Sequence, residues 1–206
     1  MDIANKLNTI ADNMTRVYEA GKAAGNDNYY DTFWDIFQDY GNRGIYFECF
    51  KIGWTDENYN PKYPIVTSDS GNTNAYDIFA YNRNITDTKV DIDISRSKST
   101  RALFIGCSKL VTIRKIITSK NITSYASCFM NCSALENITF EGEIGCNISF
   151  SSSSKLSDTS IQNIIEHLAD LTSGTAQTLT FHKTVGDKLT DEQKEAIAAK
   201  NWTLAY

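Results

Sequence analysis

A pattern that recurs at a fixed interval restricts the fold of this chain more than any other feature. The segment Phe104–Ile113, FIGCSKLVTI, recurs as Phe129–Ile138, FMNCSALENI, with Phe, Cys, Ser, Leu and Ile at the same places. Repeats of about 20 to 29 residues are typical of proteins in which every repeat adds one strand to a growing stack. Inward side chains then pack on their equivalents in the next repeat, so residue types recur at a fixed interval.

The same register predicts five strands with helices between the later ones. The strands are centred on Ile92, Ile113, Ile138, Leu179 and Trp202, and the longest interval separates Ile138 from Leu179. This long interval contains a further possible strand at Asn147–Phe150. Strands that alternate with helices at this spacing predict a parallel sheet with helices or loops behind it, and thus an α/β fold.

Two helices are expected in the C-terminal part. The first begins at Ser157 or Asp158 as N-cap and has a buried stripe of Ile161, Ile164, Ile165 and Leu168. The second begins at Thr190, with Glu192 or Gln193 near the capping-box position. Its expected buried residues are Ala196, Ile197 and Leu189.

Residues 121–140 resemble the BspA type of leucine-rich repeat. The matching positions are Ile122, Phe129, Cys132, Ser133, Leu135 and Ile138, with Cys128 where the family usually has Ala. The resemblance implies a short leucine-rich-repeat solenoid over residues 76–206. The C-terminal helix–strand–helix–strand order and the segment Tyr30–Asp35 also resemble short repeat proteins of gut Firmicutes and their prophages.

Residues 1–25 are expected to form a separate helix. Five apolar residues follow the alternating three- and four-residue spacing of a coiled-coil seam, namely Ile3, Leu7, Ile10, Met14 and Val17. We therefore predict a coiled-coil-like oligomerising helix over this segment, forming a trimer. The alternative is an amphipathic helix that packs on its own domain.

Residues 26–75 are rich in aromatic side chains and form the expected cap or linker between the helix and the repeats. Tyr30, Phe33, Trp34 and Phe37 have helical spacing, and Tyr46 and Trp54 lie in a stretch that looks extended. We interpret this region as a hydrophobic cap that closes the open end of the repeat domain. A platform on which sugars or nucleobases stack is the alternative.

Composition argues against several function classes. The net charge of −5 is spread without a basic block, which is not typical of a nucleic-acid-binding protein. There is no apolar run of about 18 residues that predicts membrane insertion, and the N-terminus does not resemble a signal peptide. Five cysteines and two histidines show no metal-site spacing, so we expect reduced, buried cysteines, no metal and no cofactor.

No catalytic constellation stands out, so we expect a protein that is not an enzyme. His167 and His182 are expected to be structural or exposed, and Asp91 with Asp93 is the only acid/base pair worth weighing. The outward strand positions form two polar columns, whose candidate binding residues are Asp91, Thr112, Asn137 and Thr178 in one and Asp93, Arg114, Thr139 and Thr180 in the other. Asn201 and Thr203 extend these columns. The columns are either a recognition face or simply side chains that suit an exposed sheet.

Three functions follow in order of preference. The first is a non-enzymatic phage or prophage virion protein of the tail or baseplate, which binds a receptor or decorates the particle. Its partners would be its own trimer mates, other virion structural proteins and a host cell-surface protein or glycan. The second is a bacterial surface-type adhesin or interaction module unrelated to a virion. An enzyme acting on surface glycans is a distant third.

Overall fold

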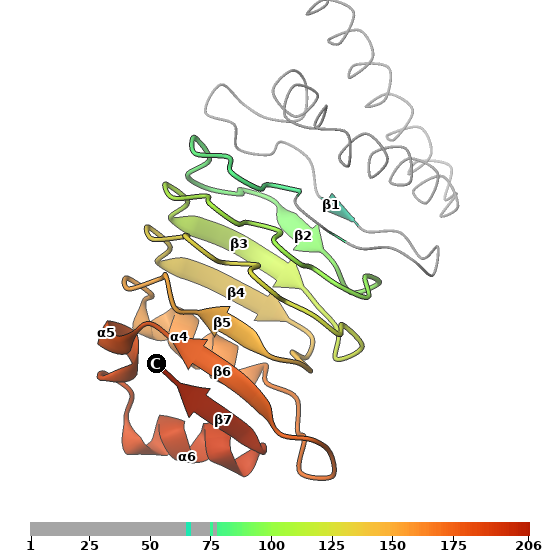
Figure 1. The fold of residues 1–206 in the computed structure, drawn as a ribbon, viewed down its shortest axis with the longest axis vertical. Coiled ribbons are helices and arrows are strands. Elements are labelled where there is room, and N and C mark those ends of the chain that lie inside the picture. Colours follow the sequence, from blue (N-terminus) through green and yellow to red (C-terminus); the bar gives the residue numbers. More distant parts are fainter. Residues whose placement is uncertain (1–64, 67–74, 76–77) are drawn as a thin grey trace, which may run out of the picture.

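The computed structural model describes residues 65–66, 75 and 78–206, which form a mixed α/β fold with two parallel sheets (Figure 1). The predicted seam Ile3–Val17 and nearly all of the aromatic region 26–75 lie outside these residues. Within them, no helix is long and apolar enough to cross a bilayer. The elements are β1 (Ile65–Val66), β2 (Asp91–Asp93), β3 (Thr112–Ile117), β4 (Asn137–Glu141), β5 (Ile148–Phe150), α4 (Asp158–Glu166), β6 (Gln177–Phe181), α5 (Lys183–Gly186), α6 (Asp191–Ala199) and β7 (Trp202–Ala205).

The first sheet has the order β1-β2-β3-β4 and carries the sequence repeat. Ile113 pairs with Ile138, as the repeat predicts, and both are buried. The expected alignment of Ile92 with Ile113 is wrong, because Ile92 pairs with Ile116. Strand β2 therefore pairs further along β3 than predicted, and an isolated bridge places the earlier residue Asp87 beside Thr112.

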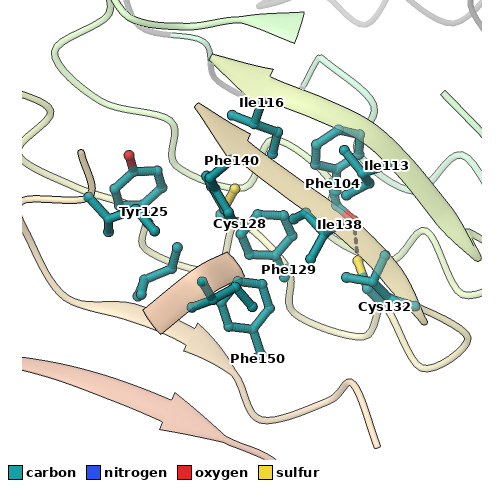
Figure 2. Packing of buried hydrophobic residues seen from close by; sticks show 14 of the residues in the cluster. Phe104, Ile113, Ile116, Tyr125, Cys128, Phe129, Cys132, Ile138, Phe140 and Phe150 are labelled. Carbon is teal, nitrogen blue, oxygen red and sulfur yellow. Dashed lines mark hydrogen bonds between the residues drawn. The ribbon is translucent and has the colours of Figure 1, made fainter. Parts of the chain in front are cut away.

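Five phenylalanine rings stack through the described core and join both sheets. The centroid distances are 4.8 Å for Phe79–Phe104, 6.0 Å for Phe104–Phe129, 4.7 Å for Phe129–Phe150 and 6.1 Å for Phe150–Phe181. Figure 2 shows Phe104, Phe129 and Phe150 within this stack. The predicted stacking of Phe104 on Phe129 is confirmed, and Phe79 adds an earlier copy at the same interval.

Hydrogen bonds between consecutive repeats follow the same interval. We call the chain before β2 (residues 78–90), between β2 and β3 (residues 94–111) and between β3 and β4 (residues 118–136) the return segments. Phe79 N–H donates to Leu103 O, and Phe104 N–H donates to Cys128 O, both at 2.9 Å. The thiol of Cys132 donates to Phe104 O at 3.1 Å, as Figure 2 shows, and Cys107 bonds to Phe79 O in the same way. The repeated Phe and Cys thus hold successive return segments together.

The backbone conformation repeats at one position even though the residue type there differs between repeats. Tyr81, Gly106 and Asn131 stand at the same place in three repeats, and their φ angles are 58°, 75° and 62°. This left-handed region is open to Gly without penalty and is tolerated by Asn, whereas Tyr adopts it at a cost of about 1–2 kcal/mol. A side chain at Gly106 would also meet the ring of Tyr81, whose Cδ1 would lie 2.6 Å from its Cβ.

Helix α4 ends the first sheet by binding the edge of β4. Ser160 Oγ accepts from Ile138 N–H at 2.9 Å, and Asn163 Oδ1 accepts from Phe140 N–H at 2.6 Å. Ser160 also donates to Glu136 O at 3.1 Å. Because these side chains occupy backbone groups that another strand would need, β4 has no further strand beside it.

The second sheet, β5-β6-β7, is a separate sheet and does not continue the first. Its strands point in the opposite direction to β2, β3 and β4 in Figure 1. The ring of Phe129, in a return segment, stacks on Phe150 of β5, so β5 continues the line of return segments. The expected single sheet running from Ile138 to Leu179 is therefore wrong. From residue 148 onward, strands form on the return side, α4 packs beside β4, and α6 packs against α4 and β7.

The predicted helix starts are confirmed. Ser157 is the N-cap of α4 and accepts from Ser160 N–H. Thr190 caps α6 in a full capping box with Gln193. In α6 only Ile197 is buried, and the expected burial of Ala196 is wrong because that residue faces solvent. The ammonium of Lys200 donates to the carbonyls of Ile165, Glu166 and Leu168, and so satisfies the C-terminal end of α4.

Candidate functional site

A β-bulge in β3 places two cationic side chains next to each other on the outer face of the first sheet. Ile113 pairs with Ile138 and Ile116 pairs with Phe140, so Arg114 and Lys115 together oppose the single residue Thr139. Both isoleucines stay buried, and both cations therefore face outward. The bulged N–H of Arg114 is satisfied by Thr88 Oγ1 at 2.9 Å.

The two cations pair with carboxylates on both neighbouring strands. Asp91 Oδ1 lies 3.1 Å from Arg114 Nε, and Asp91 Oδ2 lies 3.4 Å from Lys115 Nζ. Lys115 Nζ also donates to Glu141 Oε2 at 2.8 Å. We call Asp91, Arg114, Lys115 and Glu141 the charged cluster; it spans β2, β3 and β4.

The charged cluster orients side chains more than it stabilises the fold. The hydrogen bond from Lys115 to Glu141, with the nearby charge of Asp91, raises the pKa of Lys115. Exposed pairs of this kind contribute little to stability, because water screens them. Arg114 keeps 63% of its side chain exposed while its Nη1 donates to Lys89 O at 3.2 Å. Its guanidinium is thus held in one orientation with a free edge toward solvent.

Three other candidate residues lie on this face in different relationships. Thr112 pairs with Asn137, as predicted, and Asn137 is exposed. Asp93 pairs in register with Ile117, and its carboxylate accepts from both N–H and Oγ of Ser95. The predicted alignment of Asp91 with Thr112 is wrong, because Asp91 pairs with Lys115. The outer face therefore carries a cluster around the bulge instead of two straight columns.

Thr178 and Thr180 lie on the second sheet, apart from the charged cluster. Thr178 pairs with Thr203, and Thr180 pairs with Ser149 and Ala205. The expected partners, Asn201 for Thr178 and Thr203 for Thr180, are thus wrong, because β7 is shifted along β6. The side-chain amide of Asn201 instead donates to Leu171 O and Gly174 O.

Lys115 and Glu141 belong to the site but were not expected there. A uniform repeat interval aligns Lys115 with Phe140, an inward residue. The signal for the bulge was the spacing of apolar residues, since Ile113 and Ile116 are three apart whereas Ile138 and Phe140 are two apart. Both pairs can face inward only if β3 carries one extra residue.

The remaining candidates for chemistry have structural contacts. His182 is the N-cap of α5 and accepts from Thr184 N–H, and His167 Nδ1 contacts Asn163 O at 2.8 Å. Cys107, Cys128 and Cys132 are free and buried, as predicted, whereas Cys146 is free but only partly buried. Burial raises the pKa of Cys132 to about 12 and that of Cys146 to about 11, so these thiols are poor nucleophiles at neutral pH.

The described residues hold no group of three or more His, Cys, Asp or Glu side chains that could bind a metal ion. Comparison of the chain with protein families, with curated proteins and with solved structures finds no match. The outer face of β2, β3 and β4 is therefore identified as the candidate site from its geometry alone.

Proposed function

We propose that residues 76–206 form a short leucine-rich-repeat solenoid of the BspA type. The backbone bonds between consecutive repeats, the stacked phenylalanines and the repeated left-handed position support this assignment. In a solenoid each repeat contacts only its neighbours, so the exposed face grows by one strand per repeat and suits a ligand that lies across several strands.

The solenoid acts, in this proposal, as a non-enzymatic recognition protein whose binding face is the outer surface of β2, β3 and β4. The observation that carries the proposal is the charged cluster around the β3 bulge. Its side chains are oriented by ion pairs across three strands and yet contribute little to the core. Oriented, exposed polar groups lose little conformational entropy when a partner binds, which favours recognition.

The setting we propose is a phage or prophage virion, with this chain as a trimeric tail or baseplate subunit that binds a host cell-surface protein or glycan. Support comes from the resemblance of the sequence to short repeat proteins of gut Firmicutes and their prophages, and from the seam at Ile3–Val17. Mass spectrometry of particles purified after prophage induction tests the setting. Detection on intact producer cells, with none in particles, would support the surface-adhesin alternative.

We call the outer surface of β2, β3 and β4 the strand face. Binding by the strand face is tested by measuring how labelled protein binds to a panel of intact bacterial strains. The triple variant Arg114→Ala, Asn137→Ala, Thr139→Ala should lose most binding, because it removes the free guanidinium edge and its polar neighbours. The control Lys188→Ala, Ser173→Ala, Thr175→Ala makes the same change in charge at exposed positions remote from β3. Unchanged binding of the first variant, with native-like thermal unfolding, would refute the assignment of this face.

A further inference from the structure

A second surface with its own character lies at the tight turns that precede β2, β3 and β4. These turns lie one below another on the left-hand side of Figure 1. Tyr81 N–H donates to Ile105 O, and Gly106 N–H donates to Met130 O, so neighbouring turns are in direct contact. The next turn follows in the same line, because Ser152 Oγ accepts from Asn131 N–H at 3.0 Å. We call this column of four turns the turn edge; its segments are residues 78–85, 104–110, 129–135 and 150–156.

The turn edge is basic although the chain as a whole is acidic. Its four segments contain Arg83, Lys109 and Lys155 and no Asp or Glu, whereas the whole chain has a net charge of −5. All three cations are exposed, and none forms an ion pair with another described residue. Elsewhere on the described surface, Arg114, Lys115, Lys120, Lys183 and Lys194 pair with carboxylates, whereas the exposed cations Lys98, Arg101 and Lys188 do not, so it is the lack of Asp and Glu within these segments that makes the turn edge basic.

The same edge holds two of the three large apolar side chains that are most exposed in the described chain. Tyr81 is 56% exposed and Met130 is 48% exposed, and half-buried Ile105 lies in the turn between them. The ring of Tyr81 lies against Gly106, where a Cβ would be 2.6 Å from its Cδ1. The ring therefore packs against the backbone of Gly106, while more than half of the residue stays exposed.

We propose that the turn edge binds a linear acidic polysaccharide that runs along the stack of repeats. Consecutive repeats in a parallel stack are about 4.8 Å apart, so the cations form a row with steps of about 5 to 10 Å. Such a row matches a polymer that carries one anionic group on each sugar or each second sugar. The exposed face of Tyr81 supplies the apolar platform on which a sugar ring packs, which distinguishes a polysaccharide from an acidic peptide. The inference does not depend on the strand face proposed above.

The test measures binding of the full chain to dextran sulfate and to polygalacturonate, with neutral dextran and poly-glutamate as comparison polymers. We expect binding of both acidic polysaccharides that weakens with added salt, and at least about tenfold weaker binding of the other two. Equal binding of poly-glutamate would overturn the assignment of a polysaccharide, and equal binding of neutral dextran would overturn the role of the cations.

Matched variants locate the site. The triple variant Arg83→Gln, Lys109→Gln, Lys155→Gln should bind the acidic polysaccharides at least about tenfold more weakly, because it removes the entire row of positive charge. The control triple variant Lys183→Gln, Lys188→Gln, Lys194→Gln lowers the net charge by the same amount at the C-terminal helices and should leave polysaccharide binding intact. Tyr81→Ala should weaken binding, and Tyr81→Phe should retain it. If both triple variants lost the same share of polysaccharide binding, the loss would be explained by net charge alone, and the proposal would be overturned.

The strand-face variant separates this proposal from the preceding one. Arg114→Ala, Asn137→Ala, Thr139→Ala should bind acidic polysaccharide like the parent protein, since none of these residues lies on the turn edge. A loss confined to that variant would move the polysaccharide to the strand face, overturning the turn edge while leaving the proposed function in place.

Discussion

The ring of Phe129 stacks on the ring of Phe150 with their centroids 4.7 Å apart, although the two residues flank the break between the first and second sheets. No strand pairing connects β4 to β5, so this contact carries the core across the junction. Phe140 adds edge-on contacts to both rings, at 6.5 Å and 6.4 Å. The break in hydrogen bonding is therefore not a break in packing, and the described core is one cluster.

We expect Phe129→Ala to destabilise the protein by about 3–5 kcal/mol, because it removes a fully buried ring with three aromatic neighbours. Urea unfolding followed by circular dichroism measures the change. Met130→Ala, at the adjacent exposed position, is the control and should cost less than about 0.5 kcal/mol. Similar losses for the two variants would contradict the inward stack.

The edge of β4 should depend on Asn163. Replacing it with Ala leaves Phe140 N–H without its acceptor, at an expected cost of about 1–3 kcal/mol. Gln162→Ala, on the exposed side of the same helix, should have little effect. Hydrogen exchange gives a local readout, since the Phe140 amide should lose protection in the first variant only. Retained protection there would show that another group covers this edge.

Gly142 should not tolerate a side chain. Its φ is 85°, and a Cβ would lie 2.2 Å from Thr118 O, so Gly142→Ala combines left-handed strain with a backbone clash. The expected loss is about 2–4 kcal/mol. Gly174→Ala meets nothing closer than Leu171 O at 3.7 Å and should be nearly neutral. Thermal unfolding of both variants decides the matter, and equal melting temperatures would contradict the turn geometry.

Stability should decline in alkali through the buried thiols. Burial raises the folded-state pKa of Cys132 to about 12 from its ordinary value of 9.0. Because the unfolded thiol ionises first, the stabilisation is complete below pH 9 and is lost as pH rises toward 12, at about 1.4 kcal/mol for each unit of pKa difference. Unfolding between pH 8 and 11 should therefore show a shallower decline in Cys132→Ala than in the parent. Identical slopes would contradict the burial of this thiol.

The N-terminal seam predicts an oligomer. Light scattering of the intact chain should give three times 23.1 kDa, and Leu7→Asp with Ile10→Asp should reduce this to a monomer, since charge on the seam prevents helix association. Asn8→Asp with Asp12→Asn, off the seam, serves as the control. A monomer for the intact chain at micromolar concentration would favour the alternative, a helix that packs on its own domain.

The sequence alone determined the parts of the fold that depend on local or strictly periodic signals. Phe104 and Phe129, like Ile113 and Ile138, had to be neighbours because the same residue types recur at one fixed interval, and stacking requires that identity. Ser157 and Thr190 marked the helix starts, because capping depends only on residues within one turn. Arg114, Asn137 and Thr139 were correctly expected on an outer face for the same periodic reason.

Only the tertiary structure decided how strands and helices exchange sides after residue 141. Asn147–Phe150 could continue the first sheet only by hydrogen bonding to the edge of β4. The side chains of Ser160 and Asn163 bond to that edge instead. Likewise, the partnership of Asp91 with Lys115 followed from a bulge that is set by packing of Ile113 and Ile116 on the next strand. Both outcomes rest on contacts between residues far apart in the sequence, whose relative energies no local pattern records.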